Sequence, residues 1–343
     1  MKILFLSHQW INNSHHSLYS GFKRIITFAA EKNDVTLITW GKEEAEHMEG
    51  KIRVITVKGS GKDYFFTKRM AISRRGREIA KDFDVVHSIT SDSTFFLERH
   101  RFTVTFHVLP GVVKYHETKE KLFLFLKYHI IQKRAIRRAK NIGCVSTNLL
   151  EGIPEKYRSK AHFIPHGVDT EFWDPAQAKA PVTAPAGNYV LCVGAHGLDR
   201  TLMAEFVKAN PSLPFVFVGL RNKLEDLPNA HYLYNISNEE LRNLYAHAFL
   251  AFRPLEFATA NNAILEALAM GKTNLANRIP GVTDYLTDET CIFIDTLKDR
   301  KLDNIGDRLL DPVALRQNAI SSFSWNKVLD DYFVLYLQKE QHG

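Results

Sequence analysis

The sequence predicts an α/β protein with two doubly wound domains, each built on a mostly parallel sheet. Three observations support this fold class. Short apolar and β-branched runs alternate with helical patterns over residues 1–175. Residues 174–187 are rich in Pro and Ala and poor in large apolar groups, which is typical of a linker. The alternation of strands and helices then restarts over residues 188–324.

The expected elements follow from hydrophobic periodicity along the chain. In the first half we expect strands at 3–7, 35–40, 52–57, 84–88, 103–107, 142–146 and 162–165, with helices at 21–32, 67–82 and 117–139. In the second half we expect strands at 189–194, 215–219, 230–234, 249–252 and 273–276, with helices at 238–247, 262–270 and after Trp325. Parallel sheets of this kind bind ligands at the carboxyl ends of their strands.

Composition limits the classes of protein that the chain can form. Of its 343 residues, 45% are hydrophobic and 24% are charged, which suits folded globular domains. No apolar window is long enough for a membrane span. The three cysteines Cys144, Cys192 and Cys291 form no CxxC pair, which argues against a disulfide framework or a structural zinc site. We therefore expect a cytoplasmic protein.

Charge is distributed unevenly between the two halves. Residues 1–175 carry 29 Lys and Arg against 19 Asp and Glu, a balance of +10, whereas the remainder carries −3. A basic half can meet nucleic acid, anionic lipid or a phosphorylated substrate, or it can be an ordinary solvated surface. The chain lacks aromatic–basic RNA motifs and a helix-turn-helix pattern, so we expect no nucleic-acid partner.

The stretch that begins at Asn261 predicts an anion-binding helix N-terminus. It follows an expected strand and loop, so its free N–H groups and its dipole favour an anion. Small residues between Ala258 and Ala263 would let a ligand approach the backbone. Glu266 lies one turn further along, and a carboxylate can accept two O–H donors from a vicinal diol. The alternative is that Glu266 is an exposed helix residue.

Four segments of the second half together resemble glycosyltransferase family 4, whose members are retaining enzymes of GT-B fold. They are residues 163–173, Gly194 followed by a basic residue at Arg200, residues 253–271, and Phe323-Ser324-Trp325 before a final helix. The first half resembles the family more loosely, at 20–21, 84–87 and 104–107. The resemblance implies two Rossmann-like domains facing a central cleft. Residues 1–175, completed by helix 325–343, would bind the acceptor, and residues 188–324 would bind the nucleotide sugar.

The resemblance also implies roles for particular residues. Glu266 would accept hydrogen bonds from the ribose hydroxyls, and the diphosphate would lie at the helix N-terminus. His107 would contact the donor sugar, although it can also be an ordinary polar residue at a strand end. The remaining binding residues implied by the resemblance are Gly21, Gly194, Tyr234, Asn261, Asn262 and Ala263, of which Tyr234 lies near the expected base contacts.

The sequence departs from the family pattern at two places. The family has a Glu where this chain has Ala258, so we expect Glu256 to contact the donor sugar unless it is a simple loop charge. Arg200 stands where the family usually has Lys and would neutralise the departing diphosphate. The usual Arg directly after the glycine is replaced by Ala195. Arg253 is the candidate that would compensate, its alternative being a surface charge.

We expect no metal and no cofactor besides the donor, a nucleotide-diphosphate sugar of UDP or GDP type. His15 and His16 lack companion ligands, and no acidic pair follows a strand as a divalent-cation clamp. Residues 114–140 combine bulky apolar side chains with many basic ones. Such a segment can lie on an anionic inner-membrane surface or pack into a core.

The function predicted from these features is the transfer of a hexose-type sugar, with retention, from a nucleotide donor to a hydroxyl group. The acceptor would be a saccharide or a lipid-linked saccharide of a cell-surface glycan. One alternative is a GT-B nucleotide-sugar 2-epimerase, which would need further acids and histidines for proton abstraction. The other is a non-enzymatic two-lobed protein that binds a ligand or nucleic acid.

Overall fold

The computed structural model describes residues 1–8, 10, 17–59, 66–109, 127–194, 197–220, 222–297 and 299–338. The chain divides into two compact units. The first unit is formed by Met1–Pro165 and Trp325–Gly343, and the second by His166–Ser324. Each is an α/β domain with its own core.

The first unit contains an eight-stranded sheet with the order β3-β4-β2-β1-β5-β6-β7-β8. Every pair is parallel except β3–β4, which is antiparallel at one edge. The strands are β1 Lys2–Leu6, β2 Asp34–Gly41, β3 Ala45–Glu49, β4 Ile52–Lys58, β5 Val85–Ser88, β6 Thr103–Phe106, β7 Asn141–Cys144 and β8 Ala161–Phe163. The strand order reverses between β1 and β5, which is where doubly wound sheets bind ligands.

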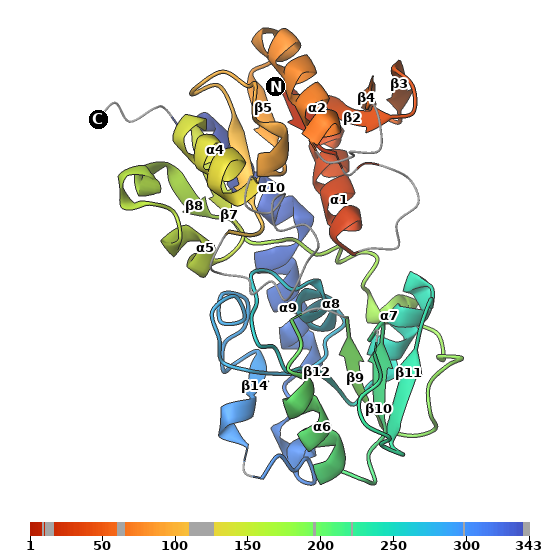
Figure 1. The fold of residues 1–343 in the computed structure, drawn as a ribbon. Coiled ribbons are helices and arrows are strands. Elements are labelled where there is room, and N and C mark those ends of the chain that lie inside the picture. The colour runs from red at the N-terminus through yellow and green to blue at the C-terminus, as the bar shows by residue number, and fades with distance from the viewer. Residues whose placement is uncertain are drawn as a thin grey trace. The chain divides into compact units, whose positions relative to one another are not determined.

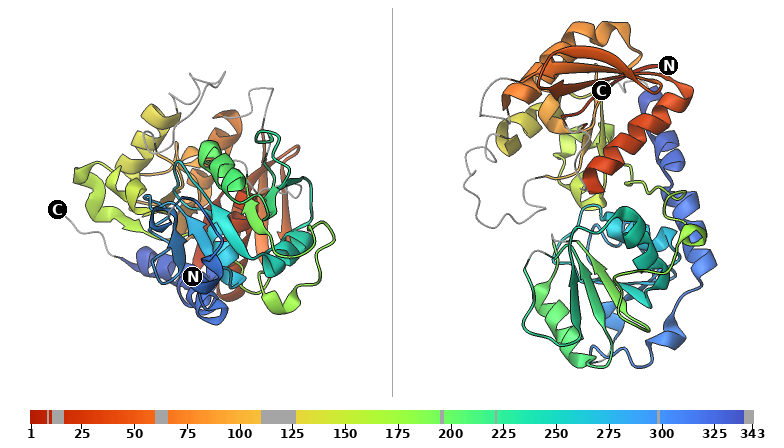
Figure 2. Two further views of the ribbon diagram at one scale, coloured as in Figure 1. Left: turned by 90° about the horizontal axis from the view of Figure 1, so that it is seen from below. Right: turned by 90° about the vertical axis from the view of Figure 1, so that its right-hand side faces the viewer.

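Helices cover both faces of this sheet. On one face, α1 (Ser17–Lys32) and α10 (Trp325–Leu337) lie side by side, and their apolar residues share a core with Ile3 and Phe5 of β1 (Figures 1 and 2). On the other face lies α2 (Phe66–Ile79), where a Cβ on Gly76 would meet the side chain of Leu6 at 2.6 Å. The alternation of Phe5 and Leu6 follows from the two-residue period of a strand. The shorter helices are α4 Lys133–Arg138, preceded by a π-helix at Lys127–Gln132, and α5 Thr147–Glu151.

A buried polar network joins α10 to the first sheet. His87 lies 2.7 Å from the Tyr336 hydroxyl through Nδ1 and 2.8 Å from Thr105 Oγ1 through Nε2. Thr105 Oγ1 lies 2.8 Å from the Tyr332 hydroxyl. Burial lowers the pKa of His87 to about 3, so the imidazole is neutral in this network. The last helix of the chain therefore belongs to the domain that contains the first strand.

The second unit contains a six-stranded parallel sheet with the order β11-β10-β9-β12-β13-β14. The strands are β9 Val190–Val193, β10 Phe215–Val218, β11 Ala230–Leu233, β12 Leu250–Arg253, β13 Asn274–Ala276 and β14 Cys291–Phe293. The order 3-2-1-4-5-6 is that of a dinucleotide-binding fold, and its reversal lies between β9 and β12.

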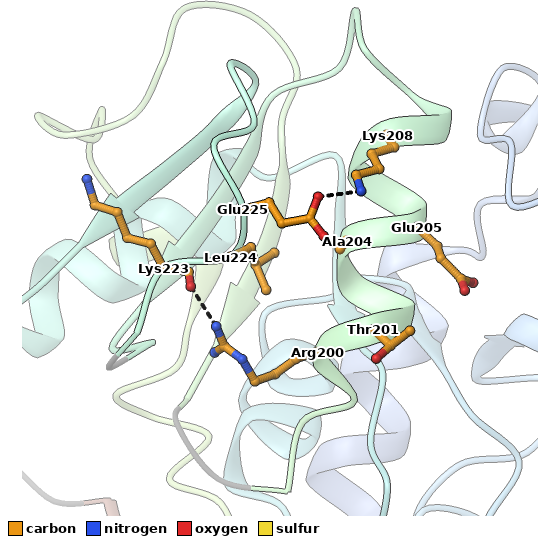
Figure 3. A pocket seen from close by; sticks show the side chains of 8 residues that line it. All are labelled: Arg200, Thr201, Ala204, Glu205, Lys208, Lys223, Leu224 and Glu225. Carbon is orange, nitrogen blue, oxygen red and sulfur yellow. Dashed lines mark hydrogen bonds and ion pairs between the residues drawn. The ribbon is translucent and has the colours of Figure 1, made fainter.

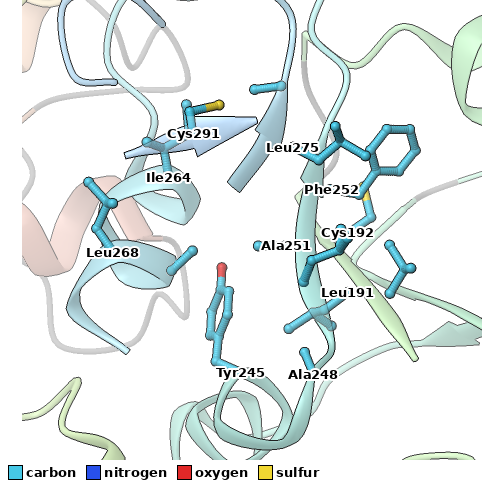
Figure 4. Close-up of a cluster of buried hydrophobic side chains, with 14 of the residues drawn as sticks. Leu191, Cys192, Tyr245, Ala248, Ala251, Phe252, Ile264, Leu268, Leu275 and Cys291 are labelled. Carbon is cyan, nitrogen blue, oxygen red and sulfur yellow. The ribbon is translucent and has the colours of Figure 1, made fainter. Parts of the chain in front are cut away.

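The helices that accompany this sheet in the described residues are α6 Arg200–Ala209, α7 Asn238–His247, α8 Asn262–Ala269 and α9 Pro312–Phe323. Each begins after a side-chain cap, since Asp199, Ser237, Asn261 and Asp311 accept hydrogen bonds from first-turn N–H groups. Figure 4 shows part of the core, where Tyr245 of α7 reaches toward the helix that carries Ile264 and Leu268. Residues 263–269 of α8 are all buried, so this helix is covered on every side.

The structure places the boundary between the domains before the stretch predicted as a linker. Residues 174–187 belong to the second unit. Ala178 and Ala184 pack against its core, and the N–H groups of Val182 and Thr183 donate to Glu240 Oε1 at 2.8 and 2.9 Å. The chain passes between the units at Pro165–His166 and at Ser324–Trp325. Residues 174–187 therefore belong to the second domain and do not form the predicted linker. Although they include few large side chains, their short side chains and backbone N–H groups hold them against that domain.

The two-domain α/β fold with parallel sheets is confirmed. Two strands are not predicted from the sequence: β3, whose residues are mostly exposed, and the short strand β14. Residues 114–126 of the basic and apolar segment 114–140 lie outside the described residues, and residues 127–138 form the π-helix and α4. Within the described parts of the chain, no helix is both long and apolar enough to cross a membrane.

Candidate functional site

The candidate site lies at the carboxyl edge of the second sheet, where the strand order reverses. Gly194 follows β9 directly, and Arg253 is the last residue of the neighbouring strand β12. Gly194 has φ +111°, a conformation that favours glycine, and its N–H donates to the Val218 carbonyl at 2.8 Å. A Cβ at Gly194 would lie 3.5 Å from Nη1 of Arg253. The backbone after β9 therefore passes directly over the guanidinium of Arg253.

Arg253 is a buried cation. Only 3% of the residue is exposed, and its Nε and Nη1 atoms are buried without a hydrogen-bond partner. No ion pair joins it to a carboxylate among the described residues. Burial raises the pKa of the neighbouring Cys192 thiol to about 11, and the charge and hydrogen bond of Arg253 partly offset this rise. The alternative that Arg253 is a surface charge is wrong. A buried guanidinium with unsatisfied donors is a group that an anion would stabilise.

Glu266 is a carboxyl group whose charge interacts with this guanidinium. It is 8% exposed, so the alternative of an exposed helix residue is also wrong. Burial raises the pKa of Glu266 to about 7, whereas a hydrogen bond from Tyr245 and the charge of Arg253 act to lower it. The Tyr245 hydroxyl lies 3.2 Å from Glu266 Oε2 and 3.3 Å from the Ala263 carbonyl oxygen. Near neutral pH, Glu266 can therefore gain or lose a proton when a ligand binds.

Helix α8 follows β12 in the sequence, with one loop between Arg253 and the start of the helix. Asn261 caps it, with its side-chain oxygen 3.3 Å from the Ile264 N–H. Asn262 and Ala263 are the first two helical residues, so their N–H groups have no acceptor within the helix. Such a helix end attracts an anion through both its free donors and its dipole.

The loop before α8 is held in place by two close backbone contacts. At Gly197, φ is +70° and a Cβ would lie 2.9 Å from the Phe257 carbonyl oxygen. At Gly281, φ is +79° and a Cβ would lie 2.3 Å from the Ala258 carbonyl oxygen. Ala258, where the family pattern has Glu, is buried under this contact, with 6% exposed. The two glycines therefore fix the path of residues 257–258 toward the helix N-terminus.

Glu256, the substitute expected for the missing carboxylate, is exposed. Its N–H donates to the Gly197 carbonyl at 2.8 Å, next to an antiparallel bridge between Leu198 and Leu255. Its side chain has no hydrogen-bond partner among the described residues. The structure thus fixes the backbone of Glu256 and leaves its carboxylate accessible.

Arg200 and Tyr234 lie on other parts of the same domain. Arg200 is the first residue of α6, and its Nη2 donates to the Lys223 carbonyl at 2.7 Å. It lines a hollow of about 560 Å³ in which Lys208 pairs with Glu225 (Figure 3). Gly194 and Arg253 are not among the residues that line this hollow. Tyr234 follows β11 and is 44% exposed, next to Asn235 with φ +53°.

The two site residues predicted in the first half lie in the other domain. His107 follows β6 and is half-buried. Gly21 lies within α1, which begins at Ser17, four residues before the predicted start. Ala195, His15 and His16 lie outside the described residues. Within the described residues, no group of three His, Cys, Asp or Glu side chains is arranged to hold a metal ion.

Three residues of the candidate site have no recognisable signal in the sequence. Tyr245 is 21 positions before Glu266, on another helix, and no motif connects them. Cys192 was considered only as a possible disulfide or zinc residue, although it contacts Arg253. Gly281 follows a proline and carries no sequence signal of its own. Only the positive φ and the contact with Ala258 show its role.

Comparison with known proteins extends this description. Residues 25–172 match the model of the family described as Glycosyltransferase Family 4. No curated protein matches the chain in sequence. Many solved structures share its fold, and three of them are described here. Sucrose-phosphate synthase from Thermosynechococcus elongatus has a TM-score of 0.70 at 17% identity, covering 98% of both chains.

The second structure is Alr3699/HepE of Anabaena in complex with UDP and glucose. It has a TM-score of 0.67 at 12% identity, covering 97% of this chain and 98% of that one. The third, WaaG, is a glycosyltransferase involved in lipopolysaccharide biosynthesis. It has a TM-score of 0.61 at 15% identity, covering 98% of this chain and 96% of that one. The GT-B fold is thus confirmed over the whole chain, and the family resemblance over residues 25–172, the half where the motifs were weaker.

Proposed function

We propose, from the GT-B fold and the match to glycosyltransferase family 4 over residues 25–172, that the protein is a retaining glycosyltransferase with a nucleotide-diphosphate sugar as donor. The donor binds the second domain and the acceptor binds the first. The acceptor is a saccharide or a lipid-linked saccharide used in cell-surface glycan synthesis, and the reaction takes place in the cytoplasm or at the inner face of the membrane.

One observation carries this proposal: the buried guanidinium of Arg253 beneath Gly194, at the reversal point of the second sheet. Two of its nitrogen atoms are buried without acceptors, and a diphosphate supplies both negative charge and oxygen acceptors. The N-terminus of α8 offers N–H groups to the same kind of ligand. The family pattern has an Arg directly after the glycine that corresponds to Gly194. In this chain Arg253, the last residue of β12, would supply that positive charge instead.

The chemistry follows from the charge that develops as the donor reacts. When the sugar–oxygen bond breaks, negative charge grows on the departing diphosphate. Arg253 and the α8 N-terminus would stabilise that charge without a metal ion. Glu266, with a pKa of about 7, would accept hydrogen bonds from the ribose hydroxyls as a carboxylate held by Tyr245. Arg200, Glu256 and His107 are proposed as further contacts of the diphosphate and the donor sugar.

Structures of similar fold support a nucleotide donor. Alr3699/HepE has been solved with UDP and glucose and with UDP-glucose, and starch synthase IV of Arabidopsis thaliana with ADP and acarbose. These ligands belong to those proteins, and they place UDP and ADP among the nucleotides to be tested with this chain.

The test measures nucleotide binding to the full chain by isothermal titration calorimetry, using UDP, GDP and ADP. We expect one of them to bind in the micromolar range to the wild type and much more weakly to Arg253→Met. Arg308→Met is the matched control, because Arg308 is exposed and in the same domain. Absence of binding for all three nucleotides would contradict the proposal.

A second measurement separates transfer from epimerisation. The enzyme is incubated with a panel of nucleotide sugars, with and without saccharide acceptors, and the products are analysed by mass spectrometry and NMR. Release of the nucleoside diphosphate with a new α- or β-glycoside of retained configuration is expected. Recovery of an epimerised nucleotide sugar would favour the alternative, a 2-epimerase.

A further inference from the structure

The first domain gathers cations at the amino edge of its sheet, opposite to the carboxyl edge where parallel sheets bind ligands. Strands β5, β6, β7 and β8 are parallel neighbours, so the segments that precede them meet at this edge. Arg77 and Lys81 precede β5. The cations before the other three strands are Arg99 and Arg101, then Arg137, Arg138 and Lys140, then Lys156, Arg158 and Lys160. We call these side chains together the basic edge.

Hydrogen bonds join the segments of the basic edge to one another. The His100 N–H donates to the Arg138 carbonyl at 2.7 Å, and Arg138 Nη2 donates to the Leu97 carbonyl at 2.9 Å. On the other side, Lys160 Nζ donates to the Ala139 carbonyl at 2.7 Å. The segments before β6, β7 and β8 therefore form one continuous surface.

The positive charges of this surface act on one another. Burial lowers the pKa of Arg138. The charges of three nearby arginines lower this pKa further, namely Arg134, Arg99 and Arg77. Glu98 lies in the same surface, but among the described residues no carboxylate forms an ion pair with Arg77, Arg99 or Arg138. The basic edge therefore carries an excess of positive charge.

Helix geometry explains only part of this arrangement. Arg77 lies in the last turn of α2, and Arg137 and Arg138 lie in the last turn of α4. A cation in such a place is stabilised by the negative end of the helix dipole. Arg99 and Arg101 belong to a loop, where no helix dipole favours them. Their position beside the two helix ends instead suits a surface that binds an extended anionic partner.

An exposed apolar side chain lies on the helical segment that leads to this edge. Along the π-helix and α4, Ile131 and Ile136 are buried, whereas Lys133 and Arg137 are exposed. Ile130 lies among the exposed residues, with 47% of its surface accessible. A helical face that combines cations with an exposed isoleucine is typical of a segment that lies on a membrane surface.

Two aromatic rings add to this apolar surface. Phe95 and Phe96 are half-buried and pack edge to face, with centroids 5.2 Å apart. The Arg134 guanidinium lies 4.8 Å from the centre of the Phe95 ring, and that of Arg74 lies 5.3 Å from the centre of the Phe96 ring. Arginines that lie over aromatic rings combine apolar surface with charged heads, as at the boundary between lipid and water.

We propose that the basic edge, together with Ile130, is a docking surface for a membrane that contains anionic phospholipid. The headgroups supply negative charge to the cations, and Ile130 enters the boundary between headgroups and acyl chains. Nucleic-acid phosphates would satisfy the cations as well, but they are contacted by polar groups and leave the isoleucine without a role. The inference goes beyond the proposed function, since it concerns a surface of the first domain and not the nucleotide site of the second.

The experiment measures flotation of the full chain with vesicles of phosphatidylcholine, with and without phosphatidylglycerol, at low and high salt. One variant combines Arg77→Gln, Arg99→Gln and Arg137→Gln, three exposed positions. A second variant has Lys at the same places and keeps the charge. The control removes equal charge from exposed positions next to β2 and β4 of the same sheet, through Lys32→Gln, Lys42→Gln and Lys51→Gln.

We expect the wild type to float with the phosphatidylglycerol vesicles at low salt and not with phosphatidylcholine alone. At about 1 M salt, where the Debye length falls to about 3 Å, flotation should be lost. The glutamine variant should partition at least about tenfold more weakly, because each cation near an anionic surface contributes to binding. The lysine variant and the control should float as the wild type does. Ile130→Ser should weaken flotation without changing the unfolding temperature.

Equal flotation of the wild type and the glutamine variant would overturn the inference, as would equal flotation with both kinds of vesicle. Tighter binding of a single-stranded RNA than of vesicles, with the same dependence on the three arginines, would assign a nucleic-acid partner and also overturn it. If the glutamine variant does not fold, Ile130→Ser decides, because undiminished flotation would contradict docking through this face.

The affinity for the nucleoside diphosphate is measured in parallel by calorimetry and is expected to be equal in the wild type and the glutamine variant. A chain that binds the nucleotide but no vesicles refutes only this inference. A chain that floats with anionic vesicles but binds no nucleotide refutes the proposed function instead.

Discussion

Replacing Arg253 with Met is expected to stabilise the second domain while removing most of its affinity for a nucleoside diphosphate. Arg253 is 3% exposed, and two of its guanidinium nitrogens are buried without an acceptor. An unsatisfied buried donor costs roughly 1–3 kcal/mol, and Met fills a similar volume without donors. Loss of the contact between Arg253 and Cys192 offsets part of this increase in the free energy of unfolding. We therefore expect a net stabilisation of about 2 kcal/mol.

The stability comparison uses denaturant unfolding of the chain without nucleotide at about pH 6, below the pKa of Glu266 of about 7. In the same preparation, loss of charge-assisted hydrogen bonds to phosphate, each roughly 1.5–3 kcal/mol, should weaken nucleotide binding about tenfold to a hundredfold or more. Arg308→Met should change neither quantity. A variant that is less stable than the wild type and binds nucleotide equally well would refute the reasoning, because Arg253 would then be a structural residue.

Three further predictions concern the surroundings of this guanidinium. The pKa of Glu266 in the fold, about 7, is above its ordinary value of 4.5, so the folded state retains a proton that the unfolded state loses and stability falls as pH rises between these values. Glu266→Gln should abolish up to about 3 kcal/mol of that fall in denaturant unfolding. Tyr245→Phe removes a hydrogen bond that lowers this pKa, so the pH at which nucleotide affinity changes should move upward in calorimetry. Gly281→Ala should destabilise the second domain by at least about 2 kcal/mol in thermal unfolding, because its Cβ would meet the Ala258 carbonyl at 2.3 Å with φ at +79°.

Each of these predictions has an outcome that contradicts it. An unchanged fall in stability with pH in Glu266→Gln would mean that another group takes up the proton. An unshifted affinity profile in Tyr245→Phe would mean that the hydroxyl does not hold the carboxylate. Gly306→Ala is the control for Gly281→Ala, since its Cβ has open space. Equal unfolding temperatures of the two glycine variants would show that the loop before α8 moves freely.

Much of the fold could be predicted because the buried strands are short runs of apolar and β-branched residues between turns. Helix α7 was predicted at its observed bounds, since Ser237 caps it and its apolar residues have helical spacing. Strand β3 was not predicted because an edge strand can be polar on both faces, and Ala45–Glu49 is mostly exposed. The domain boundary could not be predicted from composition, because residues 174–187 are fastened by backbone hydrogen bonds to Glu240 rather than by large side chains.

The candidate site could be predicted only in part. Asn261 and Glu266 follow from the helix signal, whereas the burial of Glu266 is shown only by the structure. Whether Arg253 points into the protein or to solvent depends on the neighbouring strand, which the sequence does not identify. In the first domain, Lys68 lies over the Trp40 ring and Arg69 contacts His8 and Asp92, although these partners come from separate strand ends. No local spacing connects them, so only the strand order of the sheet shows that they meet.

The central claim is that the second domain binds a nucleoside diphosphate over Arg253 and at the N-terminus of α8. A crystal structure of the full chain with the nucleoside diphosphate that binds most tightly in calorimetry tests it directly. We expect phosphate oxygens within hydrogen-bond distance of the Arg253 guanidinium and of the N–H groups of Asn262 or Ala263, with the ribose hydroxyls on Glu266. A diphosphate bound elsewhere, for example in the hollow beside Arg200 and Lys208, would contradict it.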